Sequence, residues 1–104
     1  MAEAEPLMKR ALAIDEQSFG KDHPNVARDL NNLALLLKAT NRLAEAEPLM
    51  KRALTITEKS LPGHPNVAVM LENYAQLLTQ MNRDREAAAL RGRAMVIRAK
   101  VAKE

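Results

Sequence analysis

The side chains that could perform acid–base or nucleophilic chemistry are present, but their spacing does not suit it. Neighbouring carboxylates occur at Asp15 and Glu16 and at Glu45 and Glu47. Residues one or two positions apart point to different sides of a helix, so neither pair is expected to converge on a substrate. The two serines end predicted helices, and the chain has no cysteine, so no activated nucleophile is indicated. These residues predict a protein that is not an enzyme.

The two histidines, His23 and His64, stand at equivalent places, each directly before a proline. A metal site would need further ligands at a short spacing, such as a second histidine one helical turn away, and the sequence has none. We therefore interpret both histidines as residues that cap helices. Three glycines are too few for a phosphate-binding loop or a dinucleotide fingerprint, so neither a metal nor a cofactor is predicted.

An internal repeat organises the chain. Residues 2–12 read AEAEPLMKRAL, and residues 44–54 read the same eleven letters. The block HPNVA at residues 23–27 likewise returns at residues 64–68, and a weaker third copy of the first block begins near Glu86. The chain therefore contains about two and a half units. We divide its single domain into an unpaired helix (1–22) and two repeats (23–63 and 64–104).

Each complete repeat contains two amphipathic segments. Apolar residues between Pro24 and Thr40 step by three and four positions, which is the spacing of one helix face. Proline suits the first position of a helix, and Asn41 and Asn82 follow the periodic runs as left-handed stops. The pattern predicts an all-α fold without strands. Five helices are expected, at residues 2–19, 24–40, 44–60, 65–81 and 85–103.

The apolar positions of this two-helix unit resemble the tetratricopeptide repeat, and the long period resembles the subclass found in kinesin light chains. The positions that carry the resemblance are Leu30, Leu33, Ala34, Leu37, Leu43, Ala46, Met50, Ala53 and Ile56. The resemblance implies antiparallel pairs of helices, A then B, stacked into a right-handed α-solenoid. It also implies a concave wall of A helices that binds a peptide or a partner protein, and a chain that is part of a longer array, such as those of bacterial repeat proteins.

The candidate binding residues are the positions of the two A helices that lie off the apolar stripe. Asn32 and Asn73 fall at matching places, and an amide can both donate to and accept from a peptide backbone. Relatives that hold a carboxylate with a basic clamp are not matched, because Leu35 and Glu72 occupy positions where basic or amide groups would be needed. The partner-binding candidates are Arg28, Asn31, Asn32, Leu35, Lys38, Val69, Glu72, Asn73, Gln76 and Gln80.

The first helix is a B helix without an A helix before it, so its apolar stripe lacks a partner in this sequence. We expect this stripe to drive self-association into a homo-oligomer. An alternative function is therefore a structural segment that assembles with copies of itself and binds no external ligand. The self-association candidates are Leu7, Met8, Ala11, Leu12 and Ile14.

Charge and hydropathy limit the remaining partner classes. Residues 83–104 hold seven basic and three acidic groups, but the arginines are distributed around the last helix, so nucleic-acid binding is not favoured. No apolar run approaches the roughly 18 residues that span a bilayer. The first five residues hold two glutamates and no basic side chain, whereas a targeting leader would be basic. A soluble, cytoplasmic protein without membrane contact is predicted.

Overall fold

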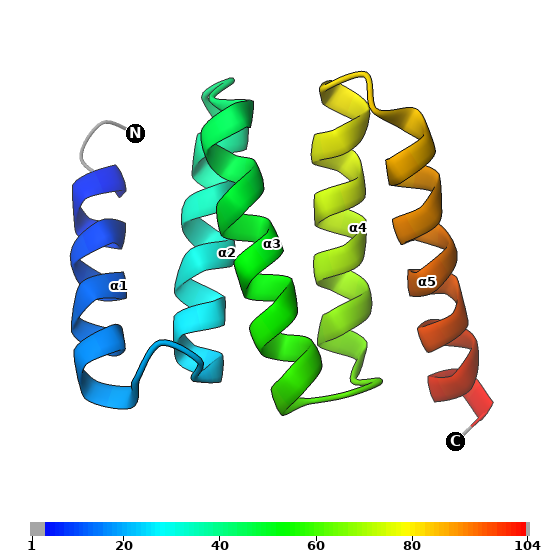
Figure 1. The fold of residues 1–104 in the computed structure, drawn as a ribbon, viewed down its shortest axis with the longest axis horizontal. Coiled ribbons are helices and arrows are strands. Elements are labelled where there is room, and N and C mark those ends of the chain that lie inside the picture. Colours follow the sequence, from blue (N-terminus) through cyan, green and yellow to red (C-terminus); the bar gives the residue numbers. More distant parts are fainter. Residues whose placement is uncertain (1–3, 104) are drawn as a thin grey trace.

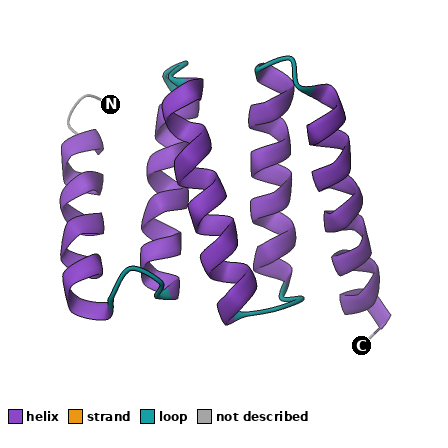
Figure 2. Ribbon diagram, in the orientation of Figure 1, coloured by secondary structure: helices purple, strands orange, loops and turns teal. Residues whose placement is uncertain are grey.

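The computed structural model describes residues 4–103, which form five α-helices and no strand. The helices stand in a row, with α1 at one end and α5 at the other (Figures 1 and 2). Each predicted boundary lies within one residue of the observed one, except that predicted helix residues 2 and 3 lie outside the described residues. The helices are α1 (Ala4–Phe19), α2 (Pro24–Ala39), α3 (Leu43–Ser60), α4 (Pro65–Gln80) and α5 (Asp84–Lys103).

Histidine begins both A helices. His23 and His64 have extended backbones before the proline at the first helical position. The Nδ1 atom of His23 accepts the backbone N–H of Asn25 at 3.1 Å, and that of His64 accepts the N–H of Asn66 at 3.0 Å. Each bond satisfies one of the N–H groups that lack an intrahelical partner. The predicted capping role of both histidines is confirmed.

Asparagine ends both A helices. Asn41 has a φ of 63° and Asn82 a φ of 61°, in the left-handed region that asparagine tolerates better than most residues. The next backbone N–H, that of Arg42, donates to the carbonyl of Leu37 at 2.8 Å, and the same bond recurs one repeat later. This is the Schellman arrangement, which satisfies carbonyls at the helix end. The predicted left-handed stops are confirmed.

The core contains the same helix-to-helix contact twice, and we call it the A–B seam. In the first repeat, Val26, Ala27 and Leu30 of α2 form one buried cluster with two residues of α3, Ala53 and Ile56. In the second repeat the copies of these residues are buried together in the larger core cluster. Those copies are Val67, Ala68 and Leu71 of α4 and Ala94 of α5, with Ile97 packed against them. A methyl group at the alanine positions allows the helices to approach closely.

We expect Ala53→Phe to lower the free energy of unfolding by about 1 to 3 kcal/mol, because a fully buried alanine has no room for an aromatic ring. The melting temperature should fall by several degrees, since about 1 kcal/mol shifts a domain of this size by roughly 4 to 8 °C. Ala13→Phe on the exposed side of α1 is the control. An unchanged midpoint for Ala53→Phe would contradict the close packing at the seam.

Ion pairs connect successive B helices along the row. The guanidinium of Arg83 in the α4–α5 loop donates to Glu47 of α3 at 2.6 Å and to Glu86 of α5 at 2.6 Å. Arg42, one repeat earlier, makes the same two contacts with Glu5 and Glu45. The hydrogen bond from Arg83 keeps the pKa of Glu47 below its usual value. Because these groups are largely solvated, each ion pair contributes little to the free energy of unfolding. The recurrence of the pairs mainly sets how one repeat is oriented on the next.

Candidate interaction surface

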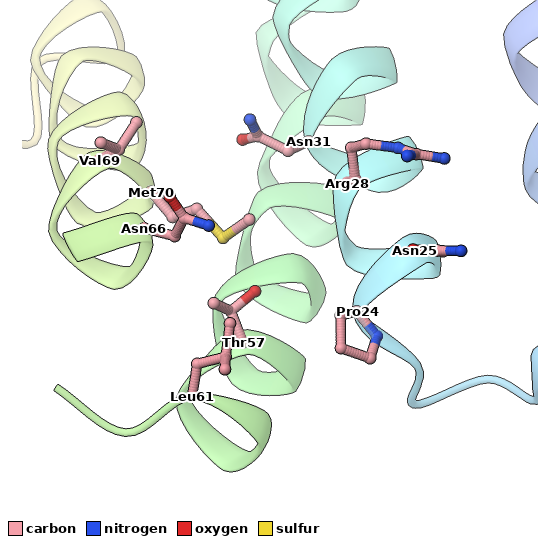
Figure 3. Close-up of a pocket in the computed structure, with 9 residues that line it drawn as sticks. All are labelled: Pro24, Asn25, Arg28, Asn31, Thr57, Leu61, Asn66, Val69 and Met70. Atoms are coloured by element: carbon pink, nitrogen blue, oxygen red, sulfur yellow. The ribbon is translucent and has the colours of Figure 1, made fainter. Parts of the chain in front are cut away.

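The main hollow between the A helices is a groove of about 330 Å³ near their N-terminal ends, with the end of α3 beneath it (Figure 3). Both A helices begin with proline, and residues from the first turns of both line this groove. The groove brings together residues that are about one repeat apart in sequence. Its lining is Pro24, Asn25, Arg28, Asn31, Thr57, Leu61, Asn66, Val69 and Met70.

The groove has an apolar floor and amides around it. Thr57 is buried, and its hydroxyl donates to the carbonyl of Ala53 at 2.9 Å, so that hydroxyl is already bonded within α3. Met70 lies between α4 and α3, and Asn31 projects from α2 toward α4 (Figure 3). Asn25 and Asn66 stand at the first turns of the two A helices. Such a surface offers apolar contact together with both donors and acceptors of hydrogen bonds.

Three of the ten predicted partner-binding residues line this groove: Arg28, Asn31 and Val69. The two aligned amides, Asn32 and Asn73, do not line the groove. Asn32 is exposed and Asn73 is half-buried. Asn32 directly follows the lining residue Asn31, so it lies at the level of the groove but outside its lining.

The remaining predicted residues differ in what they contact. Lys38 of α2 donates to the side-chain oxygen of Gln76 of α4 at 2.7 Å, which connects the two A helices. Glu72 pairs with Arg98 of α5 at 2.5 Å, and this hydrogen bond lowers the pKa of Glu72. Leu35 packs against the core, and Gln80 is exposed at the end of α4.

The sequence analysis missed most of the groove. Asn25 and Asn66 enter the sequence analysis only as part of a repeated block, although each directly follows the proline at the first position of an A helix. The spacing of Met70 predicts a core residue, and no pattern in the sequence singles out Thr57. Their place beneath a groove depends on the angle between helices, which the sequence does not state.

The structure brings together two carboxylates that the comparison of sequence neighbours did not consider. Asp15 of α1 and Asp29 of α2 come together, and a nitrogen of Arg28 lies 3.6 Å from an oxygen of each. Asp29 is 8% exposed, and its Oδ2 atom is buried without a hydrogen-bond partner. Burial, followed by the interaction with Asp15, raises the pKa of Asp29 to about 6. The pair converges across two helices, so a comparison of sequence neighbours could not find it.

The predicted self-association stripe of α1 is divided between two sides of the helix. Met8 and Leu12 are half-buried and pack against the core. Leu7 is 62% exposed and Ile14 53% exposed, and Ala11 between them is also exposed. Only these last three residues form a free apolar face, so the five do not act as one surface.

Between residues 4 and 103, no three histidine, cysteine, aspartate or glutamate side chains gather in a group that could hold a metal ion. None of the helices in the same range is long and apolar enough to cross a membrane.

Comparison with known families identifies the repeat. The family model described as "Tetratricopeptide repeat" matches residues 1–59, which is more than half of the chain. The chain belongs to the tetratricopeptide repeat family. Repeats of this family are generally scaffolds for protein interaction rather than enzymes. No curated protein matches this chain closely.

Solved tetratricopeptide structures share the fold. A crystal structure of kinesin-light-chain nearly identical TPR-like repeats from Podosopora anserina is 25% identical, with a TM-score of 0.87. A single-substitution variant of that protein gives the same values. The match covers 96% of this chain and 48% of the other, so the chain spans about half the length of these relatives. The predicted all-α solenoid and its likeness to the kinesin-light-chain repeats are confirmed.

Proposed function

We propose that the groove between α2 and α4 binds an extended segment of a partner protein. The observation that supports this most is that the groove joins the A helices of two successive tetratricopeptide repeats in one hollow of about 330 Å³. A hollow of this size accommodates one or two side chains of a peptide. It lies on the A-helix side of the repeat, where the family resemblance places the concave binding wall.

The groove chemistry favours a ligand that is apolar at one side chain and polar along its backbone. Met70 and Val69 offer apolar contact, and Val69 is 43% exposed. Asn31 and Asn66 can each donate to a peptide carbonyl and accept from a peptide N–H. Lys38 and Gln76 lie farther along the same wall, where a longer peptide would continue. We therefore expect the groove to recognise the backbone and the shape of a peptide more than its charge.

Val69→Glu should weaken binding to peptides selected from a random phage-displayed library by about 10-fold or more, because it places a charge against the apolar floor. Val96→Glu on α5 is the matched control, since Val96 is also an exposed valine, 55% accessible, outside the groove. Affinity would be measured by fluorescence anisotropy. Equal losses in the two variants, or none in Val69→Glu, would reject the groove as the site.

Two pairs of amides along the A helices can be compared directly. The groove predicts that Asn31→Ala with Asn66→Ala weakens the selected peptides by about 1 to 3 kcal/mol, the value of two hydrogen bonds. If the peptide instead lies along the aligned amides, Asn32→Ala with Asn73→Ala should cause the same loss. Melting curves should match the parent in both variants. The pair that changes affinity shows where along the wall the peptide lies.

A second candidate function is self-assembly through α1, which the exposure of Leu7 and Ile14 favours. Sedimentation velocity across a wide range of concentrations tests it, because a homo-oligomer gains mass as concentration rises. A mass that stays at 11.5 kDa throughout would reject it. A cytoplasmic location and the absence of nucleic-acid binding remain predictions alongside both candidates.

A further inference from the structure

Arg28 of α2 takes part in two neighbouring features of the molecule. It is one of the residues that line the groove between α2 and α4. Its guanidinium, however, extends away from Val69 and Asn66 on the other side of that groove (Figure 3). One nitrogen of the guanidinium lies 3.6 Å from an oxygen of Asp15 and 3.6 Å from an oxygen of Asp29. The groove therefore has an arginine at its edge whose charge is directed toward the carboxylates.

The two carboxylates hold Arg28 only weakly. A separation of 3.6 Å exceeds the range of a hydrogen bond, so the attraction is between charges. The side chain of Arg28 is also 63% exposed, which leaves it room to turn. Asp29, in contrast, is buried and cannot follow it. Arg28 can therefore leave the carboxylates for another anion without breaking a hydrogen bond to them.

We propose that Arg28 determines whether the groove accepts an acidic side chain of its peptide, and that protonation of the paired carboxylates Asp15 and Asp29 releases it for this role. The inference rests on the proposed function, because it concerns the same groove. With both carboxylates charged, Arg28 stays turned away and the groove recognises backbone and shape. Protonation removes one of the two negative charges, and the guanidinium can then pair with an aspartate or glutamate of the peptide through two parallel hydrogen bonds.

The charged groups that act on Asp29 come from two helices. Asp15 belongs to α1 and Arg28 to α2 itself, whereas Arg52, which reaches from α3 toward the end of α1, is bonded to Glu16 at 3.4 Å. Burial, followed by the interaction with Asp15, raises the pKa of Asp29 to about 6, and Arg28 opposes this rise. The departure of Arg28 therefore favours protonation of Asp29. By thermodynamic linkage, protonation favours the departure of Arg28 to the same extent.

The first test needs no peptide. In a ¹⁵N NMR titration of the full chain from pH 7.5 to pH 5.5, the Nε–H signal of Arg28 should shift with a midpoint near pH 6. The backbone amides of Val69 and Asn66 should shift with the same midpoint, because the guanidinium turns toward them. Asp29→Asn should abolish these shifts. Asp22→Asn, which removes a charge in the exposed α1–α2 loop, is the matched control and should retain them.

The second test uses peptides selected from a random phage-displayed library, once at pH 5.5 and once at pH 7.5. Aspartate and glutamate, which stay ionised at both pH values, should be enriched at one peptide position in the pH 5.5 pool only. An acidic peptide from that pool should bind about 3- to 10-fold more tightly at pH 5.5 than at pH 7.5, and its alanine version should not. Asp29→Asn should bind the acidic peptide equally well at both pH values. Arg28→Gln should remove the advantage of the acidic peptide over its alanine version.

Three results would overturn the role of Arg28. The first is an Arg28 signal that does not titrate near pH 6, or that titrates in the same way in Asp29→Asn. The second is a set of selected peptides with the same composition and affinity at both pH values, which would leave the groove as a binding site and reject only its control by protons. The third is a preference for acidic peptides that survives in Arg28→Gln. Failure to select any peptide at either pH would reject the proposed function of the groove together with this role.

Discussion

At pH 8 the Asp29→Asn variant should melt at a higher temperature than the parent chain. The carboxylate of Asp29 is buried between α1 and α2 next to Asp15, and one of its oxygens has no hydrogen-bond partner. The folded state therefore carries the cost of a poorly compensated charge. An amide of the same shape removes the charge and can donate to Asp15.

The size of this effect follows from the pKa of Asp29, which rises from 3.8 to about 6 on folding. Each pH unit of such a shift corresponds to about 1.4 kcal/mol, so the charged form costs on the order of 2 to 3 kcal/mol above pH 6. Since one kcal/mol moves the melting temperature of a small domain by roughly 4 to 8 °C, an increase of about 10 °C is expected.

The pH dependence has a definite sign. Between pH 3.8 and about 6 the folded chain binds a proton at Asp29 that the unfolded chain has lost. The contribution of this residue to stability therefore improves as pH falls from 7 to 5. Glu47 and Glu72, whose pKa values are lowered by arginine partners, act in the opposite direction and lose their stabilising effect as pH falls below about 4.5. The parent chain should be most stable in mildly acidic buffer.

Thermal melts of the parent and of Asp29→Asn at pH 5 and pH 8 measure the effect. The variant should exceed the parent at pH 8, and the difference should shrink at pH 5, where Asp29 is already protonated. Asp22→Asn in the exposed α1–α2 loop is the control for removal of a charge elsewhere. A gain that is the same at both pH values would show that burial of the charge is not its cause.

Leu71→Ala should have the largest destabilising effect in the chain, about 3 to 5 kcal/mol of unfolding free energy. Leu71 is fully buried in the second A–B seam, in the middle of the larger core cluster. Truncation removes its apolar contacts and leaves a cavity that helices on several sides cannot close. The unfolding midpoint in urea should fall strongly.

Leu7→Ala is the matched control for this change. It removes the same atoms from a leucine of α1 that is 62% exposed, so it should change stability by about 0.5 kcal/mol or less. If Leu71→Ala does not fold, the volume-conserving Leu71→Met should fold with a loss below about 1.5 kcal/mol. Similar losses for Leu7→Ala and Leu71→Ala would contradict the burial of Leu71 in the A–B seam.

The sequence by itself determined the helices, their ends and the repeat. Helix ends depend on local chemistry: a histidine before a proline caps the start, and an asparagine with positive φ ends the helix. The stacking followed because two copies of one amphipathic unit cannot each bury an apolar stripe alone.

Only the tertiary structure decided which side chains from different helices meet. Asp15 and Asp29 are fourteen positions apart, and their convergence depends on how α1 lies across α2. The groove likewise depends on the angle between α2 and α4, which placed Asn31 and Asn66 on it and left Asn32 and Asn73 outside. The periodicity of apolar residues identifies the buried face of a helix to within about one residue. A contact between two helices also depends on how each helix is rotated about its axis and on the angle at which the helices cross. Those are set by the packing of the whole core, to which every stripe contributes at once.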